Sequence, residues 1–121
     1  MRVDELDWGP IVHFYGRATE VPRLVQQLGT EQHQIAESQL AEILEHQDGV
    51  MQATPPAVIL ILRALDQNAV RDRAAVEAIL QRVRAAARFQ LDEHTRLGGK
   101  TSEPDWNLYD ESHLWPPYIS D

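Results

Sequence analysis

The chain has 121 residues, of which 43% are hydrophobic, and this size predicts one domain with a single core. It contains no cysteine, which excludes a disulfide framework, thiolate zinc sites and a cysteine nucleophile. The formal net charge is −8. Residues 1–70 hold ten acidic and four basic side chains, residues 71–100 hold four and seven, and residues 101–121 hold five acids without Lys or Arg. An acidic chain favours a basic partner over nucleic acid, which requires a cationic surface.

The first residues, MRVDELDWGP, lack the basic region and apolar core of a secretory signal. The longest apolar run, residues 57–62, is far shorter than the ~20 residues that span a bilayer. We therefore expect a cytoplasmic location and no membrane partner.

Residues 7–16 predict a short first helix, with Asp7 as its N-cap and Gly16 as its end. Thr19 is the expected N-cap of a second helix, which Gly29 ends. Apolar residues recur at helical spacing within it, at Val21, Leu24, Val25 and Leu28.

A third helix is predicted over residues 31–47, with Thr30 as its N-cap. Its apolar stripe, Ala36, Leu40, Ile43 and Leu44, lies opposite a face that carries Glu37, Glu42 and Glu45. The next stretch, His46-Gln47-Asp48-Gly49, reads as the corner after this helix, with polar groups that hold loop backbone.

Thr54 followed by Pro55 predicts the start of a fourth helix that reaches about residue 65. The run 58–62 is rich in β-formers, but the prolines suit a helix start and the neighbouring segments are helical. A fifth helix is predicted over residues 69–97, ended by Gly98 and Gly99. Its apolar positions step by three and four through Val76, Leu80, Val83, Ala87, Leu91 and His94.

Five short motifs resemble those of bacterial HEAT-like repeat proteins. They are Asp7-Trp8, His13-Phe14-Tyr15-Gly16, Val21-Pro22-Arg23-Leu24, His46-Gln47-Asp48-Gly49 and Ala53-Thr54-Pro55-Pro56-Ala57-Val58. The resemblance covers roughly residues 5–90. With the short connections between helices, it implies an all-α fold of antiparallel helix pairs, stacked as a short HEAT-like solenoid or a compact bundle. We expect residues 1–100 to form this domain and residues 101–121 an irregular acidic, aromatic tail packed against it.

Chemical motifs are sparse. No two histidines are three or four residues apart, and no HExxH motif, phosphate-binding glycine loop or nucleophile elbow is present. Glu42 and His46 are four residues apart, a spacing that fits a solvated contact on one helix better than a metal pair. The chain is therefore predicted not to be an enzyme and to hold no metal or cofactor.

The tail allows two interpretations. Trp106, Leu108, Leu114 and Trp115 could fold back over the end of the helices, or the tail aromatics and acids could contact a basic partner. The two roles are compatible if the aromatic side chains are buried and the acids point outward.

Proteins of the resembled group look similar to immunity proteins encoded beside bacterial polymorphic toxins. The resemblance implies binding of a cognate toxin and blockage of its active site, for instance a basic nuclease-like site. The expected partner-binding residues are Glu37, Glu42, Glu45, Asp48, Asp105, Trp106, Tyr109, Asp110, Glu111, Trp115 and Tyr118. The main alternative is a HEAT-like adaptor with a different protein partner. A weaker alternative is nucleic-acid binding through Arg71, Arg82, Arg84, Arg88 and Arg96.

Overall fold

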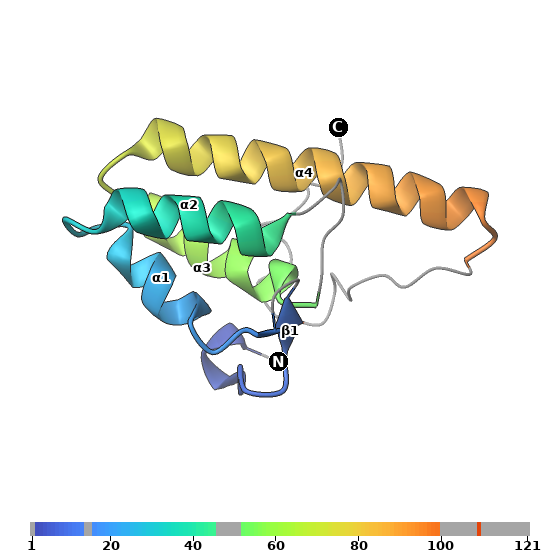
Figure 1. The fold of residues 1–121 in the computed structure, drawn as a ribbon, viewed down its shortest axis with the longest axis horizontal. Helices are drawn as coiled ribbons and strands as arrows, with labels where there is room; N and C mark the ends of the chain where they lie inside the picture. The colour runs from blue at the N-terminus through green and yellow to red at the C-terminus, as the bar shows by residue number, and fades with distance from the viewer. Residues whose placement is uncertain (1, 14–15, 46–51, 100–108, 110–121) are drawn as a thin grey trace.

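The computed structural model describes residues 2–13, 16–45, 52–99 and 109. Four helices form it: α1 (Val21–Gln27), α2 (His33–Leu44), α3 (Thr54–Asp66) and α4 (Arg73–Arg96). Consecutive helices run in alternating directions (Figure 1), and both α1 and α4 pack against other helices: α1 against α2 and α3, and α4 against α2 and α3. The predicted all-α class is confirmed, in the form of a compact helical bundle.

The predicted helix over residues 7–16 is wrong. A 3₁₀ turn, η1 (Val3–Glu5), is followed by two-residue strands β1 (Val12–His13) and β2 (Gly16–Arg17), which pair antiparallel. The Asp7 carboxylate accepts a hydrogen bond from the Gly9 amide at 2.9 Å, so it holds a turn instead of capping a helix. Pro10 has no amide hydrogen and restricts Gly9, which favours this turn over a continued helix.

The next two helices form as predicted, with shifted starts. The residue before α1 is Glu20 instead of Thr19, and Pro22 lies in the first turn, where its missing amide hydrogen is harmless. Helix α2 begins at His33, two residues later than expected. The Thr30 hydroxyl still accepts a hydrogen bond from the Gln32 amide at 3.2 Å, so it organises the turn ahead of the helix.

Helix α3 includes the β-rich run 58–62, as predicted. Thr54 is its first residue and is fully buried, and its hydroxyl donates to the carbonyl of Leu44 at 3.0 Å. This bond satisfies a carbonyl at the end of α2 that lacks a partner within its own helix. Thr54 therefore joins two helices, and the residue before α3 is Ala53.

Helix α4 begins four residues later than predicted because Asp72 caps it. The Asp72 carboxylate accepts from the Ala75 amide at 3.1 Å, the usual N-cap geometry. At the other end Gly98 and Gly99 adopt φ of 71° and 78°, and the Gly99 amide donates to the carbonyl of His94 at 2.8 Å. The predicted glycine stop is confirmed, since left-handed residues close helices in this way.

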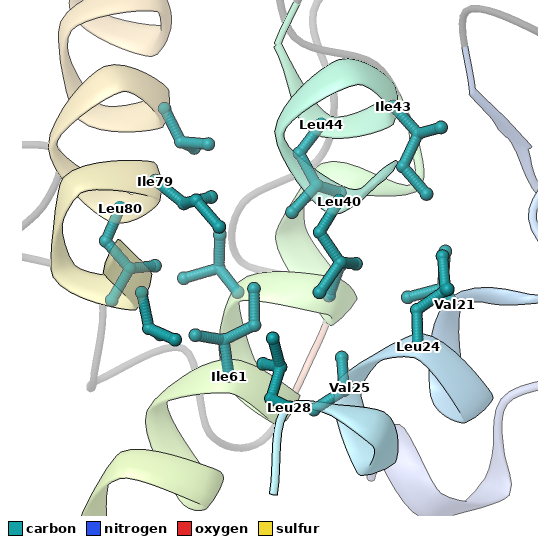
Figure 2. Close-up of a cluster of buried hydrophobic side chains, with 14 of the residues drawn as sticks. Val21, Leu24, Val25, Leu28, Leu40, Ile43, Leu44, Ile61, Ile79 and Leu80 are labelled. Atoms are coloured by element: carbon teal, nitrogen blue, oxygen red, sulfur yellow. The ribbon is translucent and has the colours of Figure 1, made fainter. Parts of the chain in front are cut away.

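The main core lies where the four helices meet. Figure 2 shows its centre, built from Val21, Leu24, Val25, Leu28, Leu40, Ile43, Leu44, Ile61, Ile79 and Leu80. A smaller cluster places Val3 of η1 and Tyr109 together against Ile59 of α3. Tyr109 thus packs with the helices although it is far from them in sequence.

The predicted stripe of α4 is buried only in its first part. Val76, Leu80, Val83 and Ala87 are buried, whereas Leu91 is 41% exposed. The helix extends beyond the other three helices in Figure 1, so its last turns have no bundle face to cover. In the described part of the chain, no helix combines the length and apolar character needed to cross a membrane.

Candidate partner-binding surface

Two of the three acids predicted on the third helix are held by other side chains. His33 Nδ1 lies 2.8 Å from a Glu37 carboxylate oxygen, and the two side chains are 21% and 12% exposed. Glu45, just after α2, accepts from Nη2 and Nε of Arg82 at 3.1 and 3.3 Å and is 13% exposed. Both carboxylates support the bundle surface, and the Glu45–Arg82 pair joins the end of α2 to α4.

Glu42 differs from these neighbours. Its side chain is exposed and makes no hydrogen bond or ion pair with the described residues. Ile35, two turns earlier on the same face, is 61% exposed. With Ser38 and Gln39, which are also exposed, these residues form a continuous strip that we call the α2 ridge. An exposed aliphatic side chain on the same helix face as an available carboxylate suits contact with a partner that is both apolar and basic.

Ile35 was not among the predicted binding residues. Its spacing was informative, because it is adjacent to the core position Ala36 and therefore falls outside the apolar stripe of α2. An isoleucine on the polar side of an amphipathic helix is the signal that could have identified it.

Of the predicted tail residues, the structure describes Tyr109. Its side chain is 4% exposed and packs against Val3 and Ile59. This is a packing position, so a partner cannot reach the ring while the cluster is closed. Seven other predicted binding residues lie outside the described residues: Asp48, Asp105, Trp106, Asp110, Glu111, Trp115 and Tyr118.

Three of the five arginines of the nucleic-acid hypothesis are paired with carboxylates. Arg82 binds Glu45, Arg96 binds Glu93 with a shortest distance of 2.7 Å, and Arg88 lies 3.7 Å from Asp92. Such pairing offsets the charge that would replace phosphate counterions.

The N-terminal turn is tied to α3 by a further ion pair. An Asp4 carboxylate oxygen lies 2.7 Å from Arg63 Nη1, and the other oxygen lies 3.3 Å from Arg2 Nη2. Hydrogen bonding to Arg63, and then to Arg2, lowers the pKa of Asp4 below its usual value of 3.8. The pair links residues 59 positions apart and helps place η1 on the bundle.

The pKa of Asp4 can be measured directly. In a carbon-detected NMR titration, the Asp4 carboxyl should titrate below 3.8, and Arg63→Gln should move its midpoint up towards that value. Because the folded pKa is lowered, any stabilisation by this pair is present above the unfolded pKa and is lost as the pH falls through the folded pKa. An unchanged Asp4 midpoint would show that the contact with Arg63 does not persist in solution.

Among residues 2–13, 16–45, 52–99 and 109, no group of three or more His, Cys, Asp or Glu side chains is arranged to hold a metal ion. No protein-family model, curated protein or solved structure matches this chain. The resemblance to HEAT-like immunity proteins therefore stays a prediction that rests on the five sequence motifs.

Proposed function

We propose that this chain is a protein-binding module that neutralises a cognate bacterial toxin by covering its active site. The α2 ridge is the observation that carries the proposal, because it offers Glu42, which has no described partner, on the same helix face as the exposed Ile35. The five motifs shared with HEAT-like immunity proteins supply the class of partner. The net charge of −8 is the second support, since an acidic surface attracts a protein whose active site binds phosphate.

The two ends of the α2 ridge act on different steps of binding. Glu42 accelerates encounter through long-range attraction, whereas Ile35 loses water on binding and slows dissociation. Glu37 and Glu45 contribute to the negative potential but remain in contact with His33 and Arg82. Binding therefore needs little rearrangement of α2.

The test measures binding to the C-terminal domain of the protein encoded immediately upstream of this gene. Glu42→Arg should slow association about threefold to tenfold at low salt and flatten its salt dependence, because steering by charge is screened. Ile35→Ala should mainly raise the dissociation rate. Asp66→Arg, an equal charge change on α3, is the matched control and should alter association much less.

A wild-type chain that neither binds this domain nor inhibits its activity would overturn toxin neutralisation. Binding without inhibition would instead favour the adaptor, which needs the same exposed ridge but a partner whose active site stays open. If binding occurs and neither ridge variant changes it, the toxin contacts another face.

A further inference from the structure

A groove runs along the surface between α1 and α3. Its first part is a hollow of about 350 Å³ whose walls include Pro22, Val25, Leu60 and Ala64. A second hollow of about 430 Å³ continues from it over the α3–α4 connection. The two hollows share Gln26 and Ala69, so together they form one depression, which we call the α1–α3 groove.

The second half of the groove is formed where the loop after α1 contacts the connection between α3 and α4. A Cβ atom placed on Gly29 would lie 2.6 Å from the carbonyl oxygen of Ala69, so only glycine permits this approach. The Arg71 amide donates to the carbonyl of Leu28 at 2.8 Å, and the Ala69 amide donates to the carbonyl of Ala64 at 2.7 Å. Such backbone bonds fix the loop, and the groove is formed without a ligand.

The polarity of the groove differs from that of the whole chain. The walls of its first part are mainly apolar but include Arg63, whose Nη1 donates to Asp4. The amide-bearing residues Gln26, Gln67 and Asn68 also line the groove. No carboxylate lines it among the described residues. Arg71 stands at one end, exposed, with its Nε donating to the carbonyl of Gly29 at 3.4 Å and no described carboxylate within 4.0 Å. An apolar channel that ends at a cation complements an occupant with an apolar side chain and a carboxylate.

The length of the groove limits the size of that occupant. From Leu60 to Gln67 the chain rises by about 10 Å along α3, at ~1.5 Å per residue. The connection to Arg71 adds a few ångströms. An extended chain rises by ~3.3 Å per residue, so about four residues fit. The three side-chain amides can hydrogen-bond the backbone of such a peptide.

We propose that the α1–α3 groove binds a short, extended acidic segment of a partner protein. An aliphatic side chain of that segment packs over Val25 and Ala64, and a carboxylate beyond it pairs with Arg71. This surface lies outside the α2 ridge, so the proposal does not rest on toxin neutralisation. A module that carries both surfaces can hold a basic and an acidic partner at once.

The test titrates the peptide acetyl-Asp-Asp-Leu-Asp-Asp-amide into the isotopically labelled full chain and follows backbone NMR signals. Saturable shifts are expected at Gln26, Gln67, Asn68 and Arg71, and affinity should fall as salt is raised. A peptide with Gly in place of Leu should bind more weakly. A peptide with Lys in place of every Asp should not shift these signals.

Arg71→Glu should raise the dissociation constant about fivefold or more, because the charge contact becomes repulsive. Arg96→Glu, the same change at an exposed arginine on α4, is the control and should leave it unchanged. Gln67→Ala, at an exposed rim position, gives a second test if Arg71→Glu disturbs the fold, and should also weaken binding.

Three results would overturn the proposal. The first is the absence of saturable shifts in the groove, or shifts that persist unchanged in Arg71→Glu. The second is movement of the groove signals in a peptide-free Asp110→Lys/Glu111→Lys variant, which would make the acidic tail of this chain the occupant. The third is movement of the same signals on dilution, which would assign the groove to a second copy of the chain.

Discussion

Replacing Ile43 with alanine should lower the free energy of unfolding by about 3 kcal/mol, within the usual range for removing a large aliphatic side chain from a core. Ile43 is 6% exposed and lies on α2 among the core residues contributed by the other helices (Figure 2). Its removal leaves a space that the surrounding helices fill only in part, so both transfer free energy and packing are lost. Urea unfolding followed by circular dichroism gives the change as a shift in midpoint at constant slope.

Ile35 provides a matched control on the same helix. It is 61% exposed, so Ile35→Ala removes the same atoms without opening a cavity. We expect a change of less than about 0.5 kcal/mol, reduced further because alanine has the higher helix propensity. Equal destabilisation by the two variants would contradict the assignment of the buried and outward faces of α2, and with it the α2 ridge.

Replacing Tyr109 with alanine should destabilise the chain by about 3 kcal/mol, comparable to removal of other large buried rings. The ring is 4% exposed and packs with Val3 and Ile59, so its loss would open the small cluster that joins η1 and the C-terminal region to α3. Tyr109→Phe keeps the ring and should cost about 1 kcal/mol or less. The same urea experiment measures both variants.

The Tyr109 variants also distinguish the two roles considered for the tail. A ring that serves only as a partner contact would leave stability unchanged in Tyr109→Ala and would affect binding alone. If both stability and binding change, the partner affinity should be compared with that of Ile43→Ala, which lowers stability at a distant site.

Most helix positions could be predicted from the sequence because apolar spacing and the residues at the helix ends pointed to the same helices. The stripe in α1, the prolines at the start of α3 and the glycines after α4 each agree with the backbone that forms. The β-rich run 58–62 is helical because it is buried on several sides by other helices, a tertiary effect that outweighs intrinsic preference.

The errors arose where one local signal was given too much weight. Asp7 has the chemistry of a helix N-cap, yet Gly9 and Pro10 make the following segment a turn. Asp72 is an equally good N-cap signal, and its capping bond starts α4 four residues after the predicted residue 69. An Asp that precedes glycine or proline can therefore hold a turn as well as cap a helix.

The candidate site was less predictable, since its character depends on partners that are remote in sequence. Glu45 meets Arg82, which is 37 positions away, and nothing in the local sequence of α2 distinguishes it from Glu42. The burial of Tyr109 against Val3 likewise depends on a contact between residues that are far apart in the sequence. Sequence spacing places a residue on a helix face, but only the packed structure shows which acids remain available.

The length of α4 has a consequence for hydrogen exchange. The helix has 24 residues, and Ala87 is the last of them that is buried. Backbone amides up to this point should exchange only when the bundle unfolds as a whole, whereas those near Arg96 should exchange through local opening of the last turns. One continuous helix therefore contains two regions with different protection, and its outer end can open many times without loss of the core.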